Sequence, residues 1–233
     1  MGMAWGLGHE LSLSILNREK LSTKGFKTLF FGTFLSSWLG SKLFFLFASS
    51  GNNFVIHSKS ISFWFGGGFV FFGGLLLGSL FIFLYCFLLK KFNPYSLYCI
   101  LPVVCFSHAL GRVGCYFSGC CFGKICNLSW GIFKMNGGSH PVQIYESIFL
   151  ILLGTYLTLK IFNDNKRNIQ EKFYKYLTVY LFSYSIFRFF IEFIRGDRLR
   201  GLYWGFSSSQ YVSFFIFISL LSLLFKKNRF LLE

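Results

Sequence analysis

The chain has 233 residues, of which 54% are hydrophobic and only 13% are charged, and its mean hydropathy is +0.57. A soluble domain carries about 25% charged residues, so this composition excludes an ordinary water-soluble globular protein. The net charge of +15 at pH 7 is typical of nucleic-acid-binding proteins. Here, however, the basic residues lie between apolar segments, and we expect no nucleic-acid partner.

Apolar segments of roughly bilayer length follow one another along the chain. A transmembrane helix needs about 20 predominantly apolar residues. Residues 3–16 form a shorter, weaker segment, which either crosses as a tilted or truncated helix or inserts halfway. Six clearer segments follow, at residues 28–49, 69–89, 96–110, 142–162, 173–194 and 211–225. The sequence therefore predicts an all-α, polytopic integral membrane protein, with six to seven transmembrane helices in a single transmembrane domain over residues 1–233.

Basic residues gather in alternate connections between these segments. Cytoplasmic loops of membrane proteins carry an excess of Lys and Arg, and anionic headgroups attract such residues without any further partner. We therefore assign the basic connections to the cytoplasm, and residues 51–63, 111–140 and 195–208 to the outer face. The basic residues concerned are Arg18, Lys20, Lys24, Lys27, Lys90, Lys91, Lys160, Lys166, Arg167, Lys172, Lys175, Lys226, Lys227 and Arg229.

Three charged residues at the outer end of the fifth clear segment share one helical face. Arg188, Glu192 and Arg195 are spaced i, i+4, i+7, so Arg188 and Glu192 can pair. Ionisable groups within a membrane are rare and costly, and they mark functional sites by default. The competing interpretation is a structural ion pair that joins two helices.

A second polar group stands at the same depth, at the start of the fourth clear segment. Pro141 suits the first turn of a helix, and the spacing of His140, Gln143 and Glu146 places them on roughly one face. Arg112 arrives from a third segment. Converging guanidinium groups bind phosphate by charge-assisted hydrogen bonds, and the phosphate at a membrane surface is a phospholipid headgroup. The residues leave open whether that lipid is a substrate, a ligand or a structural component.

Glycines punctuate two stretches of the chain. In GGGFVFFGGLLLG, residues 66–78, Gly74 and Gly78 have the GxxxG spacing of closely packed membrane helices. The functional alternative is a broken helix that lines a cavity. The same alternatives apply to GRVGCYFSGCCFG, residues 111–123. Cavity lining is favoured there, because Arg112 stands among the glycines.

Four of the seven cysteines form the pattern C-x4-C-C-x4-C at residues 115–126. This spacing lacks the paired CxxC of redox and zinc sites, so we expect no metal site. A disulfide can form on the outer face, with Cys126 joined to Cys115 or Cys121 as the less strained choices. Otherwise these cysteines are reduced and line a polar pocket. The remaining cysteines lie in apolar segments and are expected to serve packing: Cys86, Cys99 and Cys105.

These motifs, in this order, are similar to those of one enzyme family. The chain resembles the prolipoprotein diacylglyceryl transferases of bacterial inner membranes over about residues 39–213. GGGFVFFGGLLLG is similar to the family's GG-M-S-F-H-GG-L, GRVGCYFSGCCFG to G-R-x-G-N-F-x-N-G-E-x-x-G, HPVQIYE to H-P-x-Q-L-Y-E, and FRFFIEFIRGD to F-R-x-x-x-E-F-x-R-x-P-D. A shorter segment, LGSKLFFLF from Leu39, resembles the family's G-x-R-L, with Lys42 in the arginine place.

The resemblance implies an activity and its partners. The protein would transfer a diacylglyceryl group from phosphatidylglycerol to the lipobox cysteine thiol of prolipoproteins, the first step of lipoprotein maturation. Expected partners are phosphatidylglycerol, membrane lipid and prolipoprotein signal peptides with a lipobox cysteine, and no cofactor is expected. The implied location is the bacterial inner (plasma) membrane, with multiple passes and the active site toward the outer face. The alternatives are transfer of a lipid group to another acceptor, or a lipid-binding membrane protein without catalysis.

The matching positions supply the expected site residues. We expect catalysis to involve Arg112, Arg195, His140, His108 and Glu146. We expect substrate binding to involve Arg112, Arg188, Glu192, Gln143, Tyr145, Gly114, Cys115 and Ser118.

Four positions depart from the family pattern. They are Phe72 for a histidine often assigned an acid–base role, Cys115 and Ser118 for two asparagines, and Cys120 for a glutamate. If the reaction requires a side-chain base, we expect His140 or His108 to serve, since His108 lies one helical turn before Arg112.

Overall fold

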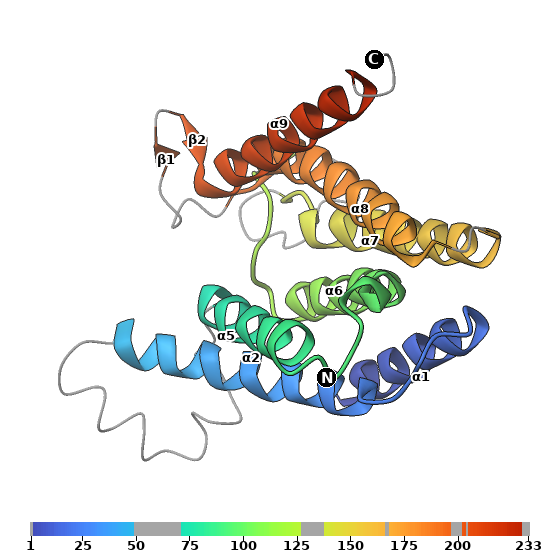
Figure 1. Ribbon diagram of the computed structural model, residues 1–233. Helices are drawn as coiled ribbons and strands as arrows, with labels where there is room; N and C mark the ends of the chain where they lie inside the picture. The colour runs from blue at the N-terminus through green and yellow to red at the C-terminus, as the bar shows by residue number, and fades with distance from the viewer. Residues whose placement is uncertain are drawn as a thin grey trace. The chain divides into compact units, whose positions relative to one another are not determined.

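The computed structural model describes residues 2–48, 71–126, 138–165, 168–196, 202–203 and 205–229. Within these ranges the chain forms helices and one antiparallel hairpin of two short strands (Figure 1). The elements in chain order are α1 (Gly2–Arg18), α2 (Phe26–Ala48), α5 (Phe71–Phe83), η1 (Leu84–Leu88), η2 (Pro94–Ile100), α6 (Leu101–Phe117), α7 (Val142–Phe162), α8 (Ile169–Ile191), η3 (Glu192–Ile194), β1 (Leu202–Tyr203), β2 (Phe206–Ser207) and α9 (Ser208–Arg229).

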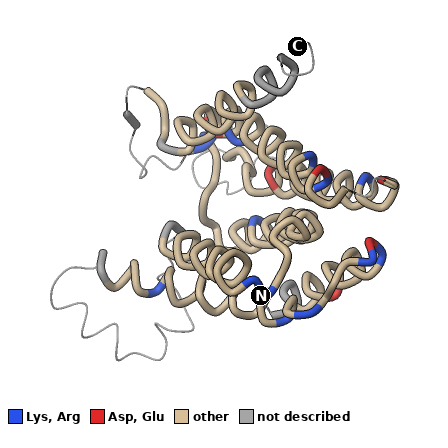
Figure 2. Tube along the Cα trace, in the orientation of Figure 1, with Lys and Arg blue, Asp and Glu red and all other residues tan. Residues whose placement is uncertain are grey.

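Several helices have the length and composition of membrane spans. Two apolar helices, Gly73–Leu88 and Ser209–Ser222, are shorter than these spans. Figure 2 shows long stretches of helix that carry neither acidic nor basic residues. The prediction of an all-α, multi-pass membrane protein is confirmed, while the number of spans and the single transmembrane domain stay predictions. Within the described ranges, four helical segments are long and apolar enough to cross a bilayer: Phe26–Leu46, Pro94–Phe117, Val142–Phe162 and Ile169–Ile194.

Some sequence expectations fall outside the described residues. These are the outer connection at residues 51–63, glycines 66–68, residues 127–137 of the connection at 111–140, Lys166 and Arg167, residues 197–201 and 204 of the connection at 195–208, and the side chain of Phe72.

The chain divides into two compact units, and the larger comprises Met1–Glu19 and Leu97–Glu233. In it, α6 packs along α7 and α8 packs along α9. Gly154 lets α6 and α7 approach closely, because a Cβ there would lie 3.0 Å from the Cβ of Cys105. The hydroxyl of Ser147 donates a hydrogen bond of 3.1 Å to the carbonyl of Ala109. Close backbones and hydrogen bonds between helices are what hold membrane helices together, where lipid removes most of the hydrophobic driving force.

A buried ion pair ties α1 to the first turn of α8. The ammonium of Lys172 binds the carboxylate of Glu19, and the hydroxyl of Tyr98 donates a hydrogen bond of 2.6 Å to the same oxygen. Asn168 caps α8 by accepting the backbone N–H groups that follow it. These contacts fix one end of α8, about 24 Å of helix from Arg188 at 1.5 Å per residue.

The smaller unit, Lys20–Ser96, packs α2 against α5 through glycines. A Cβ at Gly73 would collide with the carbonyl oxygen of Gly40, and one at Gly78 with the side chain of Ser37. A Cβ at Gly74 would lie 3.0 Å from the carbonyl oxygen of Ser37. For the described part of residues 66–78, close helix packing is therefore the interpretation that the structure supports. Lys42, which stands in the place of the family arginine, is buried in α2 of this unit.

Candidate active site

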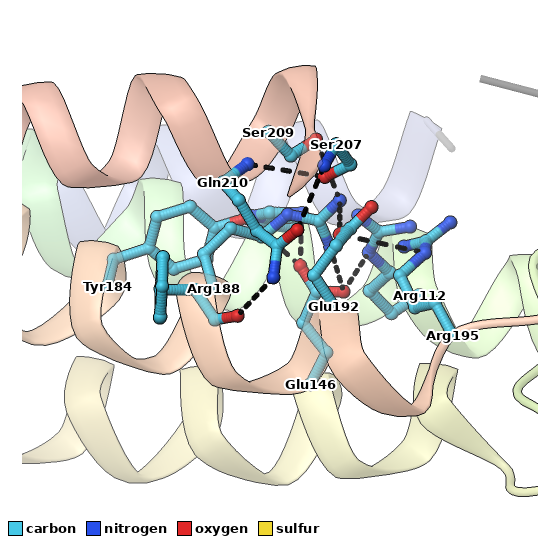
Figure 3. A network of polar contacts seen from close by, with 11 residues as sticks. Arg112, Glu146, Tyr184, Arg188, Glu192, Arg195, Ser207, Ser209 and Gln210 are labelled. Carbon is cyan, nitrogen blue, oxygen red and sulfur yellow. Dashed lines mark hydrogen bonds and ion pairs between the residues drawn. The ribbon is translucent and has the colours of Figure 1, made fainter. Parts of the chain in front are cut away.

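Glu146 of α7 is the centre of a buried polar network (Figure 3). Its Oε2 lies 2.9 Å from Nε of Arg112, which α6 supplies. Its Oε1 accepts a hydrogen bond of 3.0 Å from the hydroxyl of Tyr184 on α8 and lies 3.6 Å from Nε2 of His108 on α6. A fully buried carboxylate persists as an anion only with such partners, because desolvating an unpaired charge is costly. Three helices therefore meet at this one side chain.

Arg188 of α8 joins Glu146 to a second carboxylate. Its Nη1 lies 3.6 Å from Oε2 of Glu146, and its Nη2 lies 2.8 Å from Oε2 of Glu192. The predicted pairing of Arg188 with Glu192 is thus confirmed. Arg195 brings Nε to 3.9 Å from the same oxygen of Glu192. It does so from outside the helix, because its backbone is extended, with φ −71° and ψ 143°.

Among the residues that the structure describes, three guanidinium groups surround the two carboxylates of this cluster. The side chain of Arg112 is 15% exposed, against 8% for Arg188 and 3% for Arg195. Arg112 is therefore the cation of the three that an incoming molecule reaches first. Arginine suits phosphate because its planar fork of N–H donors matches two oxygens at once. The arrangement can bind and stabilise an anion that enters beside α6.

The hairpin and α9 hold Arg188 from another side (Figure 3). Nη2 of Arg188 donates a hydrogen bond of 3.2 Å to the hydroxyl of Ser209. The start of α9 is closed by a capping box, in which the N–H of Gln210 donates to Oγ of Ser207 at 3.3 Å and the N–H of Ser207 donates to Oε1 of Gln210 at 2.9 Å. The Gln210 amide also donates to the carbonyl of Phe189 at 3.4 Å. This reciprocal capping positions Ser209 against Arg188.

Sequence reasoning gave no site role to three members of this network, Tyr184, Ser207 and Gln210. Tyr184 lies four residues before Arg188, so the same i, i+4 rule that paired Arg188 with Glu192 would have found it. Ser207 and Gln210 have the S-x-x-Q spacing of a capping box, which is also readable from the sequence.

Backbone hydrogen bonds join the connection after α6 to two other segments near the network. The N–H of Gly123 donates to the carbonyl of His140 at 2.9 Å, and the N–H of Lys124 donates to the carbonyl of Ile194 at 2.8 Å. Gly123 forms an antiparallel bridge with Arg195. A Cβ on Gly123 would lie only 2.6 Å from the Cβ of His140, so this close approach requires glycine. The loop that follows Arg112 thereby sets the backbone of Arg195.

The second polar group is only partly on one helical face. Gln143 and Glu146 lie in α7 and are buried, and Nε2 of Gln143 donates a hydrogen bond of 2.5 Å to the carbonyl of Cys120. The prediction that His140 shares this helical face is wrong, because Pro141 is the N-cap and the helix begins only at Val142. Helical spacing therefore does not extend to His140.

The ring of His140 lies apart from the carboxylate network. Its centroid is 6.3 Å from that of Tyr145, in an edge-on arrangement. In the part of the chain that the structure describes, no hydrogen bond or ion pair joins the His140 ring to Glu146. His108 is the histidine that the structure brings to the carboxylate.

The glycines of residues 111–123 do not break α6. The helix runs through Gly111 and Gly114 to Phe117, and a Cβ at either glycine would meet nothing within 4 Å. Ser118 ends the helix, and its hydroxyl donates a hydrogen bond of 2.9 Å to the carbonyl of Gly114. The helix break that was the functional alternative is therefore absent from α6, and cavity lining by Gly111 and Gly114 stays a prediction. The chain turns only at Gly119, whose φ is +65°.

Three cysteines gather around this turn, one before it and two after it. The Sγ atoms of Cys115, Cys120 and Cys121 all lie within 4.8 Å of one another. All seven cysteines are free thiols, so the structure contains neither of the disulfides considered for Cys126. Desolvation is the largest of the causes that raise the pKa of the Cys120 thiol to about 11, and its neighbours Cys121 and Cys115 add to it.

Comparison with known proteins supports the resemblance. The family model for prolipoprotein diacylglyceryl transferase matches residues 1–226, beyond the region that the motifs delimit. A phosphatidylglycerol–prolipoprotein diacylglyceryl transferase of Clostridium tetani is 34% identical over 190 residues, covering 77% of this chain and 72% of that protein. A second one, of Clostridium perfringens, is 37% identical over 195 residues, covering 80% and 72%.

More distant relatives carry the same name. The phosphatidylglycerol–prolipoprotein diacylglyceryl transferase of Shewanella sp. strain ANA-3 is 27% identical over 217 residues, covering 88% of this chain and 78% of that protein. No solved structure matches the chain. The family match extends over nearly the whole sequence. The chain therefore belongs to the prolipoprotein diacylglyceryl transferase family.

Proposed function

We propose that this protein transfers a diacylglyceryl group from phosphatidylglycerol to the lipobox cysteine thiol of prolipoproteins. The names of its relatives support this reaction, and they favour neither another acceptor nor a lipid-binding protein without catalysis. The observation that carries the proposal is the buried cluster in which three arginines surround two glutamates among the described residues.

The chemistry requires what this cluster offers. The acceptor sulfur forms a C–S bond to the glyceryl carbon that bears the phosphate ester, the C–O bond of that ester breaks, and glycerol phosphate leaves. The phosphate changes from a diester with one negative charge to a monoester that gains a second. The proton of the thiol ends on the leaving phosphate or on solvent. Guanidinium groups aimed at that phosphate stabilise the charge as it develops, and Arg112, the most exposed of the three, is the group that we assign to it.

His108 is the side-chain base that the geometry supports best. The attacking sulfur must be a thiolate to be an effective nucleophile. His108 is 31% exposed and lies 3.6 Å from Glu146, so it faces both the network and the accessible side of α6. Glu146 would stabilise the imidazolium that forms when His108 takes the proton. His140 lacks such a carboxylate partner among the described residues, and we assign it to holding the loop at Gly123.

The placement of charge within the larger unit supports a proposal for the side of the membrane on which the network lies. Lys160 lies in the last turn of α7, and Lys172 lies near the start of α8. Glu146 and Arg188 lie at the opposite ends of the same two helices. Because basic residues mark the cytoplasmic ends of membrane helices, we propose that the protein lies in the bacterial inner membrane with the network toward the outer face.

The test is transfer in a purified system. The full chain in phosphatidylglycerol vesicles is supplied with a lipobox peptide, and the thioether product is measured by mass spectrometry. Arg112→Ala is expected to reduce the rate about 100-fold or more, the scale for loss of one charge-stabilising group. Arg18→Ala is the matched control: it removes an arginine that stacks 4.3 Å from the ring of Phe162, far along the chain from the network.

Complementation of a strain depleted of its own transferase provides the second readout. Rescue that fails with Arg112→Ala and persists with Arg18→Ala supports the proposal. A stable, membrane-inserted chain that neither rescues the strain nor modifies any lipobox peptide would overturn it.

A further inference from the structure

Three cysteine thiols lie close together, although their spacing in the sequence does not predict this cluster. Cys115 lies in the last turn of α6, and Cys120 and Cys121 follow the turn at Gly119. Their Sγ atoms lie within 4.8 Å of one another, with Cys120 exposed and the other two half-buried. Two adjacent residues in an extended chain would point their side chains in opposite directions. Here the reversal of the chain brings both back toward Cys115.

The backbone of this turn is held in an unusual conformation. Cys121 has a φ of +62°, in the left-handed region that residues with a Cβ seldom adopt. Such conformations persist where surrounding contacts dictate them, and they cluster at functional sites. The adjacent carbonyl, that of Cys120, accepts the amide hydrogen bond of the buried Gln143. The N–H of Cys120 donates to the carbonyl of Cys115 at 3.1 Å. The three thiols are therefore presented by a hydrogen-bonded turn.

We propose that Cys115, Cys120 and Cys121 form a three-thiolate site for a thiophilic divalent cation, of which Zn²⁺ is the common case. Soft thiolate ligands favour Zn²⁺, Cu(I) and iron–sulfur clusters over hard cations such as Mg²⁺ and Ca²⁺. Zinc bonds to sulfur at about 2.3 Å, which places tetrahedral sulfur ligands about 3.8 Å apart, so small rotations of the side chains suffice. Zinc sites with three protein ligands leave a fourth coordination position open. Because Cys120 is exposed, a water molecule can reach the metal and occupy that position.

The local charge suits such a site. Binding exchanges the three thiol protons for one Zn²⁺, so three protons are released and the site carries one net negative charge. Arg112 lies about one helical turn before Cys115 on α6, and its guanidinium group interacts electrostatically with the Cys115 thiol. The metal site is separate from the carboxylate network, and it stands whether or not the proposed transfer reaction is correct.

Metal content of the purified full chain tests the proposal without an activity assay. The protein is isolated in detergent under reducing conditions, equilibrated with Zn²⁺ and dialysed, and its zinc is measured by mass spectrometry. One Zn²⁺ per chain is expected. Cys115→Ser, Cys120→Ser and Cys121→Ser each remove a metal ligand, and each is expected to weaken binding by more than the about tenfold that loss of an outer-shell partner costs. Cys126→Ser, in the same loop but outside the cluster, is expected to keep full affinity.

A second measurement does not depend on the variants folding. In the unmodified protein, bound Zn²⁺ should protect three thiols from alkylation, and mass spectrometry should identify them as the cluster. Bound Co²⁺ should show a thiolate-to-metal charge-transfer band. Zinc well below one per chain, equal loss of binding in Cys126→Ser, or a disulfide between two of the three cysteines in protein taken from membranes would each overturn the proposal.

Discussion

Nε of Arg112 lies 2.9 Å from Oε2 of Glu146, and this ion pair joins α6 to α7. The same oxygen lies 3.6 Å from Nη1 of Arg188 on α8. One buried carboxylate thus holds guanidinium groups from two other helices. In a bilayer, where lipid competes for apolar contacts, such polar contacts fix the mutual positions of helices. Glu146 therefore both assembles the site and orients the cations that we assign to the phosphate.

Glu146→Gln should destabilise the protein and abolish most of its activity. Removing one partner of a buried charge cluster costs about 3–5 kcal/mol, because the remaining charges lose their compensation. Thermal unfolding in detergent and the transfer assay measure the two effects. Glu10→Gln is the control, since the side chain of Glu10 is 75% exposed. Equal thermal stability of Glu146→Gln and Glu10→Gln would contradict the central role of Glu146.

Tyr184→Phe tests a residue that the motifs do not contain. It removes the hydrogen bond of 3.0 Å to Glu146, and a hydrogen bond to a charged group contributes about 2 kcal/mol. We expect a transfer rate lowered about tenfold, with the chain still folded. Tyr180→Phe, one turn earlier on α8 and stacked on Tyr184, should retain the activity of the unmodified chain. If both variants behave alike, the Tyr184 hydroxyl has no special role.

His108→Ala should slow transfer more than His140→Ala, because only His108 faces Glu146. A base that deprotonates the acceptor thiol becomes dispensable once the thiol ionises by itself, above its pKa of about 8.5. The deficit of His108→Ala should therefore be largest near neutral pH and shrink as the pH rises above that value. The measurement is the pH profile of the transfer rate. Unaltered thioether formation in the double variant His108→Ala, His140→Ala would rule out both histidines.

Gly123→Ala should disturb the loop that positions Arg195. The added Cβ would lie 2.6 Å from the Cβ of His140 and 2.7 Å from Cγ2 of Val142, and such overpacking costs about 1–3 kcal/mol. We expect lower thermal stability and slower transfer. Gly6→Ala in α1, where a Cβ meets nothing within 4 Å, should leave stability unchanged or raise it by up to about 1 kcal/mol. A fully stable and active Gly123→Ala variant would show that the loop yields without consequence.

The spacing of residues along the sequence was enough to predict part of the site. Arg188 and Glu192 pair because residues four apart on a helix are neighbours whatever the fold around them. The apolar segments predict helices because their composition permits little else in a membrane. The same rule fails at His140, where Pro141 delays the start of α7 to Val142.

The sequence by itself determined the membrane class, the family motifs and the concentration of arginine near one end of the helices, because these depend on composition and on contacts within a single helix. Only the tertiary structure decided which groups meet: Arg112 with Glu146 across α6 and α7, Tyr184 with the same carboxylate, and three cysteines around one turn. The physical reason is that such meetings depend on how helices pack and where glycines let the chain turn back. The cysteines illustrate this best, since their spacing resembles no metal site and their sulfur atoms nonetheless converge.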